Sequence, residues 1–162
     1  VLDRAPVADA RERFLHVRRH AGVRVDDGAI QLRVEADKLQ KQLDKFMIES
    51  ISSFDAANEG FYHGMMLGLC AVLSNRYRVL SNRESGLGRF DIMLIPKVKS
   101  IPAFIYEFKY TKDEKVKLEE LADEALKQID EKKYETELID LDVKEIIKIG
   151  IAFRGKSAVV RK

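Results

Sequence analysis

Residues 103–110 read AFIYEFKY, and residues 89–95 read RFDIMLI. Both stretches have the aromatic and β-branched composition of buried strands, yet the first contains Glu107 and Lys109 and the second contains Asp91. An unpaired charge inside an apolar strand is costly because it must be removed from water. Side chains alternate between the two faces of a strand, so Glu107 and Lys109 share one face. The two stretches therefore predict adjacent strands that bring two carboxylates and a lysine together.

The face of residues 103–110 opposite Glu107 is aromatic and suits the packing of a helix. The same alternation predicts that Asp91 points away from Phe90 and Ile92 on the neighbouring strand. The aromatic face consists of Phe104, Tyr106, Phe108 and Tyr110.

Apolar periodicity predicts the remaining helices and strands of residues 38–162. One helix is expected from Lys38 to the Ser52-Ser53 pair, and a second from the N-cap Asn58 to about Leu73. The order helix, three strands, helix, strand predicts an α/β fold with a mixed central β-sheet flanked by helices. The buried face of the second helix is expected to consist of Phe61, Met65, Leu69 and Val72. The later elements are expected as strands over 77–84 and 89–95 with a turn at 85–88, a strand over 103–110, a helix over 114–134 and strands over 146–153 and 157–160.

Composition places the chain in a broad class. Its 162 residues are 46% hydrophobic, enough for one domain with a core, and its formal net charge is only +2. The single Cys70 excludes an internal disulfide and suggests a buried, reduced thiol. The sequence has no run of eighteen apolar residues and no signal segment at its start. We therefore expect a soluble, cytoplasmic protein with no membrane partner.

The first 37 residues differ from the rest, because they contain seven arginines and no lysine. Arginines surround Phe14 and Leu15 in what is predicted to be a short basic helix. This segment has three interpretations: a solvated helix of separate origin, an arm that contacts phosphates, or the remnant of a neighbouring domain. We expect a boundary that separates residues 1–37 from a domain over residues 38–162.

Asp91, Glu107 and Lys109 suit metal-assisted hydrolysis of a phosphodiester. Mg²⁺ prefers oxygen ligands and commonly binds one or two carboxylates, here Asp91 and Glu107, and the backbone carbonyl of Phe108 is a candidate third ligand. Such an ion polarises a phosphate and lowers the pKa of a bound water. Lys109 is expected to orient that water or to offset negative charge in the transition state. The alternative is a buried ion-pair network without catalysis.

These residues resemble the PD-(D/E)XK nuclease superfamily. Arg89-Phe90-Asp91-Ile92 matches its aspartate motif, with Phe90 in place of the proline, and Glu107-Phe108-Lys109 matches its (D/E)XK motif. The likeness extends over about Leu39 to Phe153 and implies a three-layer, restriction-endonuclease-like core of order αβββαβ. The sequence that flanks these motifs is similar to a RecB-like bacterial branch in which the domain usually follows an AAA-type ATPase. The ATPase itself is not part of this resemblance, because no phosphate-binding Gly-x-x-x-x-Gly-Lys motif occurs here. The segments that carry this similarity are Phe61-Tyr62-His63-Gly64, Ser81-Asn82-Arg83-Glu84-Ser85-Gly86 and Arg89-Phe90-Asp91-Ile92-Met93-Leu94-Ile95-Pro96.

The resemblance also implies further site residues. RecB-type members carry a glutamine and a tyrosine on the helix after the third strand, which match Gln128 and Tyr134. Many members add a glutamate from the first core helix as a metal ligand, and Glu59 is the candidate. The alternatives are an exposed helical glutamine, an ordinary packing tyrosine and a first-turn acid favoured by the helix dipole. His63 is expected to be a packed or hydrogen-bonded histidine rather than a ligand.

The expected function is therefore a nuclease that hydrolyses DNA with Mg²⁺ or Mn²⁺. Its expected partners are DNA, an AAA-type ATPase module and a second copy of the chain in a homodimer. A catalytically inactive module that binds nucleic acid or a protein partner is the main alternative, and a domain that positions an ATPase in an assembly is another. A Ser-His-Asp hydrolase has little support, because no Gly-x-Ser-x-Gly elbow occurs.

Overall fold

The chain divides into two units, Val1–Val34 and Glu35–Lys162. In the first unit, β1 (Arg24–Asp26) and β2 (Ala29–Gln31) form an antiparallel pair. The predicted basic helix around residues 11–19 lies outside the described residues. The computed structural model describes residues 24–26, 29–31, 36–52, 56 and 58–162.

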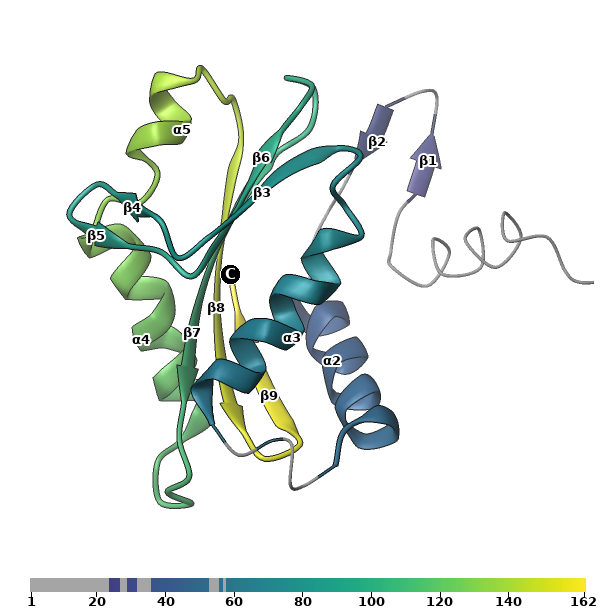
Figure 1. The fold of residues 1–162 in the computed structure, drawn as a ribbon, viewed down its shortest axis with the longest axis vertical. Coiled ribbons are helices and arrows are strands. Elements are labelled where there is room, and N and C mark those ends of the chain that lie inside the picture. Colours follow the sequence, from purple (N-terminus) through teal and green to yellow (C-terminus); the bar gives the residue numbers. More distant parts are fainter. Residues whose placement is uncertain (1–23, 27–28, 32–35, 53–55, 57) are drawn as a thin grey trace, which may run out of the picture. The chain divides into compact units, whose positions relative to one another are not determined.

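A five-stranded mixed sheet in the order β3-β6-β7-β8-β9 forms the centre of the second unit (Figure 1). Neighbouring strands are antiparallel except β7 and β8, which are parallel. A parallel pair needs a long crossover, and α4 (Leu118–Glu131) with α5 (Thr136–Asp140) supplies it. A mixed sheet flanked by helices is therefore confirmed. The strands are β3 (Tyr77–Ser81), β6 (Ile92–Pro96), β7 (Ala103–Tyr110), β8 (Ile146–Arg154) and β9 (Ser157–Arg161).

Helices cover both faces of this sheet, with α4 on one side and α2 (Ala36–Ser50) and α3 (Glu59–Ala71) on the other (Figure 1). On the α3 side, the ring of Tyr62 stacks on that of Phe153 with centroids 4.6 Å apart. On the α4 side, Ile105 of β7 lies in one buried cluster with Ile129 and Tyr134. The two faces of residues 103–110 therefore differ as predicted, and Glu107 lies on the α4 face in register with Gly150 of β8.

The strands before the site are shorter than predicted. The expected strand over 77–84 ends at Ser81, because Asn82 has a φ of 52° that turns the chain out of the sheet. Two short strands, β4 (Glu84–Ser85) and β5 (Gly88–Arg89), then form a separate hairpin.

The expected strand over 89–95 is interrupted as well. Asp91 lies at a bend directly before β6 rather than inside a strand. Phe90 packs in the same cluster as Met93 and Tyr134 on the α4 side, so the predicted regular alternation around Asp91 is wrong at Phe90. The break leaves the Asp91 side chain free to contact the backbone of β7, as described below.

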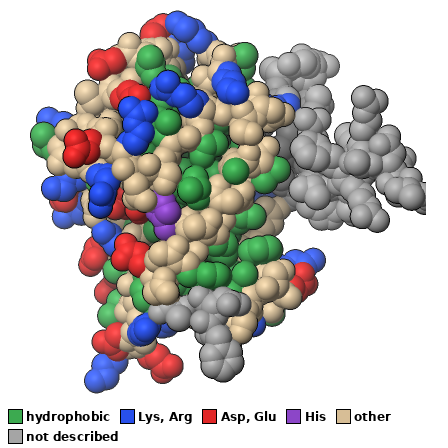
Figure 2. Space-filling view, viewed as in Figure 1, with side chains coloured by type: hydrophobic (Ala, Val, Ile, Leu, Met, Phe, Trp, Pro, Cys, Tyr) green, Lys and Arg blue, Asp and Glu red, His purple; other side chains and the backbone are tan. Residues whose placement is uncertain are grey.

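The buried face predicted for α3 is wrong. Tyr62, Met66 and Cys70 are buried, whereas Leu69 and Val72 are exposed. Figure 2 shows hydrophobic side chains on the surface over this helix. The N-cap is confirmed, since the Asn58 side chain accepts a hydrogen bond from Phe61 N–H.

The helix expected over 114–134 is α4, which is shorter at both ends and runs from Leu118 to Glu131; α5 lies beyond the expected range. Local hydrogen bonds of Asp113, to Thr111 Oγ1 and from Lys115 N–H, favour a turn before α4 begins at Leu118. None of the helices in the described part of the chain could cross a membrane, given their length and polarity.

Gly150 sets how closely α4 packs on β8. A Cβ atom there would stand 2.4 Å from the Ala122 carbonyl oxygen and 2.6 Å from Leu126 N. We expect Gly150→Ala to lower the free energy of unfolding by about 3 kcal/mol, because α4 backbone must move away from the sheet. Gly68→Ala is the control, since a Cβ there meets no atom within 4 Å and alanine favours a helix. Urea unfolding of both variants measures the difference, and equal stability would contradict the close contact.

Candidate functional site

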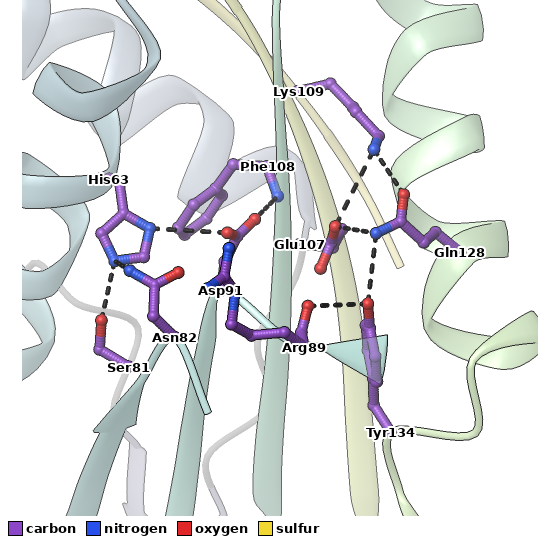
Figure 3. A network of polar contacts seen from close by, with 10 residues as sticks. All are labelled: His63, Ser81, Asn82, Arg89, Asp91, Glu107, Phe108, Lys109, Gln128 and Tyr134. Atoms are coloured by element: carbon purple, nitrogen blue, oxygen red, sulfur yellow. Dashed lines mark hydrogen bonds and ion pairs between the residues drawn. The ribbon is translucent and has the colours of Figure 1, made fainter. Parts of the chain in front are cut away.

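One of the two carboxylates, Glu107, belongs to β7, and the other, Asp91, contacts β7 from the neighbouring segment. Asp91 lies where β6 ends its pairing with β7, one residue before the Ile92↔Tyr106 pair. Its Oδ2 accepts a hydrogen bond of 2.8 Å from Phe108 N–H (Figure 3). Glu107 lies within β7 and is only 4% exposed. The break in the strand thus places a side-chain oxygen of Asp91 against the backbone directly after Glu107.

Gln128 on α4 joins Glu107 to Lys109. The Lys109 ammonium donates to Gln128 Oε1 at 2.5 Å and lies 3.9 Å from Glu107 Oε1. Gln128 Nε2 in turn donates to Glu107 Oε1 and to the Tyr134 hydroxyl (Figure 3). The Gln128 side chain is therefore half-buried within the network rather than free on the surface.

Tyr134 lies in the turn after α4 rather than on that helix, and it both packs in the core and contacts the polar network. Its ring is fully buried beside Phe90, and its hydroxyl donates to the Arg89 carbonyl oxygen at 2.8 Å. The base of the β4–β5 hairpin is thereby bonded to the same network as Gln128. A packing tyrosine here also holds the polar site together.

Ionising both carboxylates would place more negative charge in the site than their surroundings offset. Burial, and then the Asp91 carboxylate, raise the pKa of Glu107 to about 8, although Lys109 opposes this. Burial also raises the pKa of Asp91, against the hydrogen bond from Phe108 N–H. Glu107 Oε2 is buried and has no hydrogen-bond partner among the described residues. Hard-oxygen donors with one unpartnered buried atom fit a divalent cation.

The other two predicted ligands, Glu59 and the Phe108 carbonyl, have no hydrogen bond to Asp91 or Glu107 among the contacts of the described residues. Glu59 is exposed in the first turn of α3, and its charge contributes to raising the pKa of both Asp91 and Glu107. Phe108 enters the site through its N–H, so a metal contact by its carbonyl stays a prediction. Within the described ranges, no three His, Cys, Asp or Glu side chains form a ready-made metal cluster. The set of Asp91, Glu107, Phe108 and Glu59 as ligands therefore remains a prediction.

The prediction of a packed or hydrogen-bonded His63 is confirmed, but its place beside Asp91 was not predicted. His63, on α3, lies with its Nδ1 3.6 Å from Asp91 Oδ1, and its Nε2 contacts Ser81 and Asn82 (Figure 3). The spacing of Glu59 and His63, one helical turn apart, was a signal that both face the same place. Nothing in the sequence pattern indicated Ser81 and Asn82, since both depend on where β3 ends.

The metal-free chain is expected to lose stability as pH rises from about 4.5 to about 8. The unfolded chain releases the Glu107 proton near its ordinary pKa of 4.5, whereas the folded chain keeps it up to about 8. Folding therefore binds a proton in this window, so the stabilisation is complete below pH 4.5 and lost above pH 8. We expect urea unfolding with a chelator to give a free energy lower by about 2 kcal/mol at pH 8 than at pH 5.

Excess Mn²⁺ at pH 8 should restore part of that free energy by binding the folded chain. Stability that increases between pH 5 and pH 8 in the chelator would contradict the raised pKa of Glu107.

Comparison with known proteins agrees with the geometry. Neither the curated proteins nor the solved structures gave a match. A sequence model of the PD-(D/E)XK nuclease superfamily matches residues 57–162, more than half of the chain, and this range contains Asp91, Glu107, Lys109 and Gln128. Members of this superfamily are generally hydrolytic nucleases that use divalent metal ions. The chain therefore belongs to the PD-(D/E)XK nuclease superfamily.

Proposed function

We propose that the chain is a metal-dependent nuclease domain that hydrolyses phosphodiester bonds in DNA. The observation that carries the proposal is Glu107, a carboxylate that is 4% exposed, has one unpartnered oxygen and lies 3.9 Å from Lys109. This arrangement does not serve stability, because a buried carboxylate that is not fully compensated destabilises the folded state. Binding a divalent cation would compensate the carboxylate charge, and the cation together with Lys109 would attract an anionic substrate.

Asp91 and Glu107 would hold the divalent cation, Mg²⁺ or Mn²⁺, with Glu59 and the Phe108 carbonyl as additional ligands. When bound, the cation would polarise the scissile phosphate and make a bound water more acidic. Lys109 supplies a fixed positive charge beside the phosphate oxygens, and Gln128 holds the Lys109 ammonium in place by accepting its hydrogen bond. Gln128 also donates to Glu107 Oε1, so the other oxygen of Glu107 stays available for the ion.

The nucleic acid would meet exposed cations at the edge of the site. Arg83, Arg89, Lys132 and Lys133 are exposed and take part in none of the ion pairs found among the described residues. They lie together because Leu87 N–H, at the tip of the hairpin, donates to the Lys132 carbonyl oxygen at 2.7 Å. Exposed cations of this kind contact phosphates without reading sequence.

The other finer proposals rest on the sequence, through its family resemblance and its composition. We propose a RecB-like affiliation, a three-layer core of order αβββαβ, a cytoplasmic location, and cooperation with an AAA-type ATPase module or a second copy of the chain. Residues 1–37 and 38–162 are proposed as separate domains.

Calorimetric titration with Mg²⁺ and Mn²⁺, beside cleavage of plasmid and single-stranded DNA in the same buffers, tests the function. We expect the native chain to bind and cleave, and Asp91→Asn to weaken binding at least about tenfold and abolish cleavage. Metal binding without cleavage would indicate a missing partner or substrate. Absence of both would favour the inactive binding module instead.

A further inference from the structure

His63 has polar contacts at both ring nitrogens. Its Nε2 lies 2.8 Å from Ser81 Oγ and 3.2 Å from Asn82 Nδ2, and its Nδ1 lies 3.6 Å from Asp91 Oδ1. Its side chain is only 16% exposed, and the edge-to-face ring of Phe108 lies 6.0 Å away. A ring packed and bonded in this way has one orientation.

The contacts of Nε2 determine where the imidazole proton lies. An amide nitrogen only donates, so Nε2 must accept the hydrogen bond from Asn82. The Ser81 hydroxyl can donate or accept, so its contact with Nε2 is compatible with the same tautomer. A neutral His63 therefore carries its proton at Nδ1, the atom that faces Asp91 Oδ1.

Asn82 also holds Asp91 through the backbone. Its φ of 52°, a conformation that asparagine tolerates, ends β3 and directs its N–H to the Asp91 carbonyl oxygen at 3.0 Å. The Asp91 carboxylate is thus approached from two sides, by Phe108 N–H at Oδ2 and by His63 Nδ1 at Oδ1. Together these contacts leave the carboxylate few orientations.

We propose that His63 is a positioning residue, whose Nδ1–H fixes the Asp91 carboxylate in the orientation that holds the divalent cation. Asn82 sets the tautomer that makes this possible, and the Ser81 contact is compatible with it. The proposal rests on the proposed metal-dependent nuclease function and adds to it a set of residues beyond the ligands. Partners that orient a metal ligand typically change metal affinity or activity by about 10–100-fold.

Two substitutions of His63 distinguish the role of Nδ1 from that of Nε2. Asparagine at position 63 keeps a donor near the place of Nδ1, whereas glutamine places its amide near that of Nε2. We expect His63→Gln and His63→Ala to weaken Mn²⁺ binding about tenfold or more and to lower kcat at unchanged KM for DNA. His63→Asn should remain within about threefold of the native chain on both measures. Gly64→Ala, next to His63 with no atom within 4 Å of the added Cβ, is the control for disturbance of α3.

Calorimetry with Mn²⁺ alone measures affinity without turnover, and long-range ¹H–¹⁵N spectra at pH 8 report the tautomer directly. The chain has three histidines, so comparison with His63→Asn assigns the signal of His63. An Nε2-protonated ring, or equal affinities for Mn²⁺ in His63→Ala and the native chain, would overturn the positioning role while leaving the nuclease proposal intact. A native chain that neither binds Mn²⁺ nor cleaves would overturn both.

Ser81→Ala separates this role from another reading of the same residues. Ser81 contacts one ring nitrogen of His63 and Asp91 faces the other, which is the spatial arrangement of a Ser-His-Asp hydrolase triad. In such a triad, loss of the serine nucleophile removes nearly all catalysis. A positioning role predicts a loss in kcat below about tenfold for Ser81→Ala. A complete loss with unchanged Mn²⁺ affinity would overturn the positioning proposal in favour of a triad.

Discussion

Glu107→Gln is expected to abolish cleavage and at the same time to stabilise the metal-free chain. Cleavage should fall by at least about 10³-fold, because the amide cannot supply the negative oxygen that the cation needs. The free energy of unfolding at pH 8 should increase by about 1–2 kcal/mol, since a buried carboxylate with a pKa raised to about 8 is replaced by a neutral group. Plasmid cleavage and urea unfolding in a chelator, at pH 5 and pH 8, measure the two effects.

Glu135 is a matched control for this substitution. Its Oε2 is also buried without a partner among the described residues, but its Oε1 lies 3.1 Å from the Lys148 ammonium. Glu135→Gln removes half of an ion pair and should therefore destabilise the chain without affecting cleavage. A Glu107→Gln variant that unfolds like Glu135→Gln would show that Glu107 belongs to a structural network rather than to a metal site.

The sequence predicted β7 completely and its neighbour only in part. Residues 103–110 form one strand because six of the eight positions are apolar or aromatic and only Glu107 and Lys109 are charged. The strand over 89–95 was predicted from the same kind of pattern, but the break at Asp91 depends on a hydrogen bond to Phe108 N–H. A contact with another strand is invisible to local periodicity.

The buried face of α3 shows a different limit. Both candidate faces of this helix are apolar, so its sequence does not distinguish them. The choice is made by Tyr62, which stacks on Phe153 and donates from its hydroxyl to the carbonyl oxygens of Ala56 and Gly155. Phe153 and Gly155 are distant in sequence, and their contacts with Tyr62 determine which face of α3 is buried.

The candidate site was predictable where its residues lie on regular elements. Glu107, Lys109 and Gln128 follow from strand alternation, helical spacing and the family resemblance, and the structure brings the three together. The contacts of His63 with Ser81 and Asn82 were not predictable, because they form where β3 stops.

Lys109→Met is expected to lower kcat by about 10²–10³-fold while the chain still binds Mn²⁺. Methionine keeps much of the side-chain volume but removes the charge 3.9 Å from Glu107 and the donor to Gln128. Single-turnover cleavage and calorimetry separate the loss of chemistry from the loss of binding. Lys127→Met is the control, since Lys127 is exposed on the same helix as Gln128 and pairs only with Glu131 among the described residues.

Removing Lys109 should also change the pKa of Glu107. Its charge lowers the pKa of Glu107, so Lys109→Met should raise that pKa further and strengthen the loss of stability with increasing pH. Adding Glu107→Gln should cancel this effect, because no carboxylate is left for the lysine to compensate. The two substitutions are therefore non-additive in stability, as expected for groups in contact. Additive effects in a double-mutant cycle, together with full cleavage by Lys109→Met, would show that the lysine neither compensates Glu107 nor acts on the substrate.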